Sequence, residues 1–386
     1  MISTFYNNDR GKTFLFSVLF FIVILLSVFL LQTCSVFDGK LEVKKEAKEF
    51  RAAKERQQKI YKSVIANVET EPVGAASTED DAADDPAIWY SAKTPANSII
   101  FGTNKKGGIH AYDLSGRELQ FVPCGKINNI DIRRSVKMGK SEVDVLVGSN
   151  RSDSTLVLFL IDENGAIKSE ADYRIQLGDF EPYGLCLYKT EAASLFAFVN
   201  NKNGEVHQIT ISLDVNNELV TAIVRKLKLP TQVEGMVVDD DGHRLFVGEE
   251  GAGIYLFSAW PAGDTDGVLL EGSTESNNKI SFDIEGLALL PPHYLVASSQ
   301  GNFSYAIFDL EKRKYVDSFI IKKGLVDGSE ETDGLEIMSK GLGTMFPKGL
   351  LVVQDGFNFD DTIKRNQNFK LVDLGEVLSL LGEMDK

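Results

Sequence analysis

Histidine and cysteine are scarce in this chain, which has four histidines and three cysteines among 386 residues. No two of them stand at the spacing of a zinc site or of a redox dithiol. Zinc-dependent chemistry and disulfide exchange are therefore poor explanations of this sequence. It also lacks an arginine-histidine-glycine motif, which is part of the signature of histidine acid phosphatases.

Positive charge is in short supply as well. The 41 lysines and arginines face 56 aspartates and glutamates, so the formal net charge is −15. Nucleic acids need a basic surface because their phosphates are negatively charged. This balance argues against a nucleic acid as the partner and is compatible with a protein that binds cations.

Long uncharged apolar runs are missing except near the start, where residues 14–31 follow Arg10 and Lys12. This run is at the lower limit for a bilayer-spanning helix and is long for a cleaved signal. Cys34 follows in a Leu-Gln-Thr-Cys context that loosely resembles a bacterial lipoprotein signal. We expect an exported protein of the cell envelope that touches the membrane only through its N-terminus. The anchor is either an uncleaved helix at residues 14–31 or a lipid on Cys34.

The sequence does contain a pattern that returns six times, about every 50 residues, as in repeat proteins. In each copy a polar or aromatic residue stands beside glycine or apolar residues, at Asp84-Asp85-Pro86, Asn129-Ile130-Asp131, Tyr183-Gly184, Glu234-Gly235, Glu285-Gly286 and Asp333-Gly334. A second polar group ends an apolar segment about 20 residues after each of these. These second groups are Asn104-Lys105-Lys106, Asn150-Arg151, Asn201-Lys202, Glu249-Glu250, Gln300-Gly301-Asn302 and Gln354-Asp355-Gly356.

Short apolar segments bounded by turn residues fill the repeats and predict an all-β, six-bladed β-propeller with one repeat per blade. We expect a signal peptide or membrane anchor at residues 1–35, a charged helical linker at 36–61 and the propeller, as a monomer, at 62–386. Residues 63–68 are predicted to complete the last blade, and residues 373–381 to form a short terminal helix.

Equivalent positions of all blades meet around the axis of a propeller, so the two polar groups should form two rings at one mouth. The first three copies supply cations, at Lys105, Lys106, Arg133, Arg151 and Lys202, together with Tyr183. The last three supply acids and amides, at Glu234, Glu249, Glu250, Asp283, Glu285, Gln300, Asp333 and Asp355. The pattern predicts a basic side and an acidic side. Taken alone, each of these polar groups is an ordinary turn or surface feature. Only their recurrence at equivalent positions of all six copies favours a functional site.

Clustered carboxylates repel one another unless a cation lies between them, and calcium suits them because it takes six to eight oxygen ligands. Lysine and arginine hold phosphoryl oxygens, so an anionic phosphate ester is the expected substrate. Because no histidine or cysteine recurs in phase, we expect direct attack by a calcium-bound water rather than a covalent phosphoenzyme.

Longer motifs strengthen this hypothesis: DDAADDPAIW (80–89), TNKKGGIHAYDL (103–114), INNIDIR (127–133), EPYGLCLY (181–188), VEGM (233–236), DIEGL (283–287), SSQGNFSYAIF (298–308), TDGLE (332–336) and QDGFN (354–358). In this order they resemble the β-propeller phytases, the alkaline calcium-dependent enzymes of the 3-phytase type, over about residues 69–370. The resemblance implies hydrolysis of phytate (myo-inositol hexakisphosphate), as its calcium complex, to phosphate and lower inositol phosphates.

The resemblance also implies roles for individual residues. The phosphate-binding positions match Lys105, Lys106, Arg133, Tyr183 and Lys202. The calcium ligands of the cleft match Asp84, Glu234, Glu250, Asp283, Glu285 and Gln300, with Glu234 holding the attacking water. The family's positions near calcium ions that mainly stabilise the fold match Asp85, Asp327, Asp333, Asp355 and Asn358. The chain departs from the family at Phe357, where an acid is frequent, and at Asn203, where a glutamate is frequent.

Two other functions stay open at this point. A propeller lactonase or esterase with one calcium ion would explain the acids, but it needs no cluster of lysine and arginine. A non-catalytic binding propeller on the cell surface is the second alternative, and the in-phase acids disfavour it.

Overall fold

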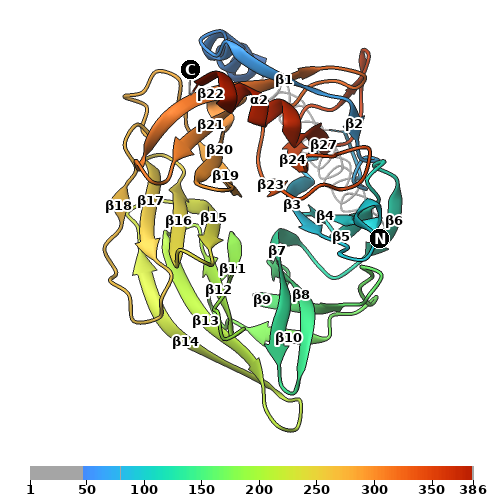
Figure 1. The fold of residues 1–386 in the computed structure, drawn as a ribbon, viewed down its shortest axis with the longest axis vertical. Helices are drawn as coiled ribbons and strands as arrows, with labels where there is room; N and C mark the ends of the chain where they lie inside the picture. The colour runs from blue at the N-terminus through green and yellow to red at the C-terminus, as the bar shows by residue number, and fades with distance from the viewer. Residues whose placement is uncertain (1–46, 79, 385–386) are drawn as a thin grey trace, which may run out of the picture. The chain divides into compact units, whose positions relative to one another are not determined.

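The computed structural model describes residues 47–78 and 80–384, and residues 55–386 form one compact unit. Within the described residues, six sheets of four or five strands stand in a ring, beside one small sheet of two strands (Figure 1). This confirms the predicted six-bladed β-propeller. The first blade holds β3 (Ala83–Trp89), β4 (Ile99–Asn104), β5 (Gly108–Tyr112) and β6 (Glu118–Val122), with a 3-10 turn, η1 (Pro95–Asn97), between β3 and β4.

The next three blades repeat the same antiparallel order from the axis outward. The second holds β7 (Ile127–Met138), β8 (Ser141–Asn150), β9 (Thr155–Ile161) and β10 (Tyr173–Gln176). The third holds β11 (Leu185–Lys189), β12 (Leu195–Asn200), β13 (Glu205–Leu213) and β14 (Leu219–Lys228). The fourth holds β15 (Val233–Asp239), β16 (Arg244–Glu249), β17 (Gly253–Ser258) and β18 (Val268–Leu269).

The last two blades take in the strands that precede the first blade. The fifth holds β19 (Ile284–Leu290), β20 (Tyr294–Ser299), β21 (Ser304–Asp309), β22 (Lys314–Lys323) and β1 (Lys62–Ala66), with the 3-10 turn η2 (Gln300–Asn302). The sixth holds β23 (Leu335–Met338), β24 (Leu350–Asp355), β27 (Asn368–Asp373) and β2 (Val68–Glu69). A hairpin of β25 (Phe359–Asp360) and β26 (Ile363–Lys364) lies between β24 and β27 in sequence.

The ring closes differently from the prediction. Residues 63–66 belong to β1, which pairs in parallel with β22 of the fifth blade, with Ser63 opposite Ile320. Only β2 pairs with the sixth blade, where Val68 stands opposite Leu371 of β27. The prediction that residues 63–68 together complete the last blade is therefore wrong for residues 63–66. The N-terminal segment instead ties two neighbouring blades together.

Packing between blades provides the core. Each inner strand contacts the next around the axis, and β23 returns to β3. Large apolar side chains fill the space between neighbouring sheets, as where Phe101 of the first blade and Phe159 of the second belong to one fully buried cluster. Burial of this kind is the main stabilising contribution to the fold.

Two helices accompany the blades in the described part of the chain. One spans residues 47–57, inside the region predicted to be a helical linker. The other, α2 (Leu374–Met384), confirms the predicted terminal helix. Neither of them, nor any other helix in the described ranges, has the length and apolar character needed to cross a bilayer. The predicted anchor at residues 14–31 and Cys34 lie outside the described residues.

Candidate active site

Irregularities in the inner strands create the polar mouth. The pairing of four of the six inner strands with their neighbours shifts register, at Ala83–Pro86, Ile127–Ile130, Val233–Met236 and Ile284–Leu287. Such bulges redirect side chains that regular alternation would send elsewhere. They fall on four of the six repeated polar groups, which explains how acids inside apolar strands reach the axis.

The glycines of the repeat have a packing role. A Cβ atom on Gly184 would lie 1.9 Å from the carbonyl oxygen of Glu234, and one on Gly235 would lie 1.9 Å from the carbonyl oxygen of Glu285. Only glycine lets the backbone of the next blade come this close. A glycine at this position of the repeat therefore indicates tight contact between blades rather than an ordinary turn.

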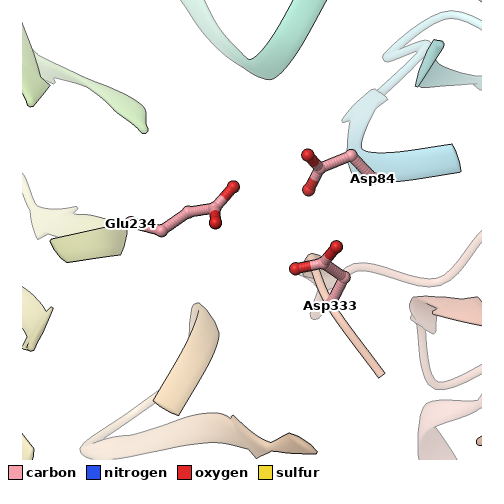
Figure 2. A group of neighbouring side chains, drawn as sticks. All are labelled: Asp84, Glu234 and Asp333. Atoms are coloured by element: carbon pink, nitrogen blue, oxygen red, sulfur yellow. The ribbon is translucent and has the colours of Figure 1, made fainter. Parts of the chain in front are cut away.

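Three carboxylates from distant parts of the chain converge at the mouth (Figure 2). Asp84 belongs to β3, Glu234 to β15, and Asp333 to the segment before β23, and one oxygen of each lies within 4.8 Å of the others. Glu234 also belongs to a second group of the same tightness, with Glu250 and Glu285. All five side chains are buried. The predicted acidic ring is thus present, with Glu234 shared by both groups.

Burial and mutual repulsion make these acids reluctant to ionise without a counter-ion. Burial is the main cause, and it raises the pKa of Asp333 and of Glu250 to about 7. The pKa of Glu234 is raised by burial, and those of Asp84 and Glu285 are raised well above the usual value by burial and then by Asp333 and Glu234, respectively. Repulsion within such a cluster is relieved when a cation binds.

The donor set fits a divalent cation. Among the described residues, Oδ1 of Asp84 and Oε2 of Glu285 are buried oxygens without a hydrogen-bond partner. The second oxygen of Asp84 has only a long ion pair of 3.5 Å with Lys105. Buried carboxylate oxygens without partners are costly, and hard cations with oxygen ligands satisfy them.

Lys105 lies among the acids rather than apart from them. Its ammonium group is 2.8 Å from Asp81, 3.5 Å from Asp84 and 3.3 Å from Asp333. Burial opposes the charged form, but the carboxylates of Asp84 and Asp333 outweigh it and raise the pKa of Lys105. The prediction of separate basic and acidic sides is therefore wrong at this point, because Asp81 and Asp84 stand at the start of the same blade as Lys105 and ring closure adds Asp333 from the sixth.

Two of the other predicted cations lie over one aromatic ring. Lys202 lies over the ring of Tyr183 at 4.3 Å, and the guanidinium of Arg151 lies 5.6 Å from its centroid. The Tyr183 hydroxyl hydrogen bonds to Glu234, and Asn128 donates to Oε1 of Glu234 at 2.6 Å. Tyr183 thus brings the cations and the acid cluster together.

The remaining predicted residues of the mouth occupy its rim. Lys106 is exposed next to Lys105 at the turn between β4 and β5. Asp283 is half-buried, and its charge raises the pKa of both Glu250 and Glu285. Its carbonyl oxygen accepts a hydrogen bond of 2.9 Å from the amide of Gln300.

Arg133 does not belong to this mouth. It lies four residues beyond Asn129 on β7, and a strand advances about 3.3 Å per residue, so it stands toward the other end of the channel. Its guanidinium holds Asp131 at 2.8 Å, Asp240 at 2.9 Å and the carbonyl oxygen of Leu187 at 2.6 Å. The prediction that Arg133 binds substrate beside Lys105 is wrong, and Arg151 is the arginine that the structure brings to Tyr183.

Asp85 also turns away from the acid cluster. Its Oδ2 accepts a hydrogen bond of 3.0 Å from the amide of Ile130 on the second blade. With Arg133 and Glu336 it lines a channel cavity of about 820 Å³ formed by the later parts of the inner strands. Neighbours along the chain, Asp84 and Asp85 therefore serve opposite ends of the channel.

A third polar group surrounds a buried lysine in the sixth blade. The ammonium group of Lys370 contacts Glu69 and Asp327, and it lies 3.1 Å from both Asp355 and Asn358. Three of the residues predicted to stabilise the fold, Asp327, Asp355 and Asn358, are thus brought together. The other two, Asp85 and Asp333, are not, because Asp333 belongs to the mouth and Asp85 to the channel.

Both departures from the family lie near these groups. The ring of Phe357 packs edge to face against that of Phe303, with 6.4 Å between the ring centroids. The ammonium nitrogen of Lys364 lies 5.6 Å from the centroid of the Phe357 ring. Asn203 is exposed in the turn after β12, where its amide donates to Asn201 and its carbonyl oxygen accepts from Lys228.

The sequence pattern did not single out Asn128, Glu69 or Lys370, which belong to these groups. Asn128 directly precedes the Asn129 that the repeat singled out, but only the bulge in β7 decides which of the two faces Glu234. Lys370 stands in a segment of alternating character between Phe369 and Leu371, so its complete burial had no signal in the pattern.

Comparison with known proteins agrees with this geometry. A sequence profile of the phytase family matches residues 34–386. The 3-phytase of Bacillus subtilis (strain 168) is 40% identical over 334 residues, which are 83% of this chain and 86% of the relative. A solved luciferin-regenerating enzyme superimposes with a TM-score of 0.50 over 79% of this chain and 96% of its own, but its 10% identity makes this a likeness of fold alone. By the extent of the profile match and its identity to that relative, the chain belongs to the phytase family.

Proposed function

We propose that this protein is a phosphoric monoester hydrolase of the 3-phytase type that releases phosphate from phytate. The observation that carries the proposal is the arrangement around Tyr183, where the Glu234 carboxylate meets the hydroxyl and the cations of Arg151 and Lys202 lie over the ring. One site thereby combines a carboxylate that can accept a proton from water with cations that can hold phosphate.

Calcium is the metal that this mouth suits best. One ion would be held by Asp84, Glu234 and Asp333, and a second by Glu234, Glu250 and Glu285. Bound calcium would offset the charge of the carboxylates and polarise the phosphoryl group under attack. Burial raises the pKa of each of these acids, so calcium binding requires that the acids release their protons.

The protein's own groups then have separate tasks. Glu234 is held by Asn128 and Tyr183 so that its carboxylate can orient a water molecule and take its proton. Arg151 and Lys202 bind phosphates of the substrate from the second and third blades. Lys105 can exchange its carboxylate partners for a phosphate, and Lys106 contributes a further charge at the rim.

Phosphate release from phytate by the purified protein, with calcium or with excess chelator, tests this function. We expect release with calcium and none with the chelator. A folded, calcium-loaded protein that releases no phosphate from phytate contradicts the proposal and favours a binding propeller. Hydrolysis of a lactone in place of phytate favours the lactonase alternative.

We further propose that the enzyme works outside the cytoplasm as a tethered monomer. The support is the apolar run at residues 14–31, Cys34 after it, and the charged linker that precedes the propeller. Such a tether would keep a hydrolase of a soluble polyanion at the cell surface, where the released phosphate can be taken up.

A further inference from the structure

The end of the linker is hydrogen-bonded to a turn at the edge of the mouth. The guanidinium of Arg56 donates from Nε and Nη2 to the carbonyl oxygen of Gly301, at 2.8 and 2.6 Å. The neighbouring Gln57 donates from Nε2 to the carbonyl oxygen of Phe303 at 2.9 Å. Two side chains that precede the first blade thus hold two carbonyl groups of one turn in the fifth blade.

This turn is tightly packed on its other side. It consists of η2 and Phe303, which has a positive φ of 51° and donates its amide to the carbonyl oxygen of Gln300 at 3.1 Å. A Cβ atom on Gly301 would lie 1.9 Å from the carbonyl oxygen of Phe282. Because no space separates the turn from residue 282, any displacement of the turn must also displace the segment around that residue.

The same segment carries an acid of the mouth. The amide of Gln300 donates to the carbonyl oxygen of Asp283 at 2.9 Å. The charge of Asp283 in turn acts on Glu250 and Glu285. A continuous series of contacts therefore runs from Arg56 and Gln57, through the turn, to the acidic wall.

We propose that Arg56 and Gln57 are positioning residues that set the geometry of the calcium-facing wall formed by Gln300, Asp283 and their acidic neighbours. Neither residue touches substrate. The linker would thus do more than connect the propeller to the envelope, because its attachment keeps the mouth in the form that binds metal. This inference rests on the proposed function only in taking calcium as the cation of the mouth.

The double variant Arg56→Ala, Gln57→Ala tests the inference in the full-length protein, with Lys59→Ala as a matched control on an exposed linker residue. Calcium binding is measured by titration calorimetry without phytate. We expect the double variant to bind calcium about tenfold more weakly than the control, since loss of groups that orient metal ligands has effects of this size. Its kcat at saturating calcium should stay near that of the wild type. Arg56→Lys should bind with intermediate affinity, because an ammonium group can still donate to the Gly301 carbonyl.

Two outcomes overturn the inference. The first is a calcium isotherm equal to that of Lys59→Ala, which indicates a purely structural contact if the melting temperature in chelator is lowered at the same time. The second is failure of the wild type to bind calcium at all. If the wild type binds calcium but releases no phosphate, the proposed function fails while the calorimetric comparison still decides the role of Arg56 and Gln57.

Discussion

The ammonium nitrogen of Lys105 lies 3.3 Å from Oδ2 of Asp333, although 228 residues separate the two in the chain. The contact exists because the propeller closes the first blade onto the sixth. It partly neutralises the acid cluster in the absence of ligands. When calcium and phosphate bind, we expect Asp333 to turn to the metal and Lys105 to the phosphate, so that one pairing is exchanged for two.

Glu234→Gln should nearly abolish turnover while leaving the fold intact. Glutamine can still accept hydrogen bonds from Asn128 and Tyr183, but it lacks the charge needed to hold a metal and to take a proton from water. We expect kcat to fall about 100-fold or more, the scale of general-base catalysis. Steady-state phosphate release at saturating calcium–phytate measures this. Near wild-type kcat would remove Glu234 from the chemistry.

Arg151→Ala and Arg133→Ala should have opposite consequences. Arg151 lies beside Tyr183, so its loss should raise KM for phytate roughly tenfold, which corresponds to about 1.4 kcal/mol. Arg133 links the second, third and fourth blades through Asp131, Leu187 and Asp240. Its loss leaves two carboxylates without their partner and should destabilise the fold by about 2–3 kcal/mol with KM unchanged. Parallel kinetics and thermal melting separate the two, and a raised KM for Arg133→Ala would restore it to the substrate site.

Stability without calcium should fall as the pH rises through neutrality. In the folded protein the pKa values of Asp333 and Glu250 are raised to about 7, against about 4 in an unfolded chain. Stability from their protonated forms is fully present below about pH 4 and is lost as the pH approaches 7, because the unfolded chain binds fewer protons in this window. Melting temperatures in chelator between pH 5 and 8 should decrease, and saturating calcium should remove the decrease. A melting temperature that rises with pH in chelator would contradict this prediction.

Lys370→Met should be among the most destabilising single changes in the propeller. The side chain is fully buried and its charge is balanced by Glu69, Asp327 and Asp355. Removing one partner of such a group costs about 3–5 kcal/mol. We expect added calcium to restore part of the lost stability, because the same oxygens can then bind the ion. Chemical denaturation with and without calcium tests this, and Lys322→Met, at an exposed position of β22, is the control.

Cys34→Ala decides between the two anchors. If residues 14–31 span the bilayer, the variant remains in the membrane fraction, and this is the outcome we expect because glutamine and threonine precede the cysteine. Release of the variant into the soluble fraction, or loss of labelling by radioactive palmitate, establishes a lipid on Cys34 instead.

The repeat pattern was sufficient to predict the number of blades, the all-β fold and the acids of the mouth, because strand length and turn chemistry are local properties of the sequence. Glu234, Glu250 and Glu285 could be predicted together for the same reason: equivalent positions in successive blades must meet at the axis. The terminal helix was likewise predicted, at residues 373–381, and the structure has α2 at Leu374–Met384.

Three features depended on tertiary structure. Bulges in the inner strands decide which of two adjacent polar residues faces the mouth, and so they send Asp84 to the acids and Asp85 into the channel. Ring closure places Lys105 beside Asp333 and divides residues 62–69 between two blades. Position along β7 sends Arg133 to the opposite end of the channel from Arg151. Each outcome depends on register and on contacts between blades, which are set by packing over long separations and leave no periodic signal in the chain.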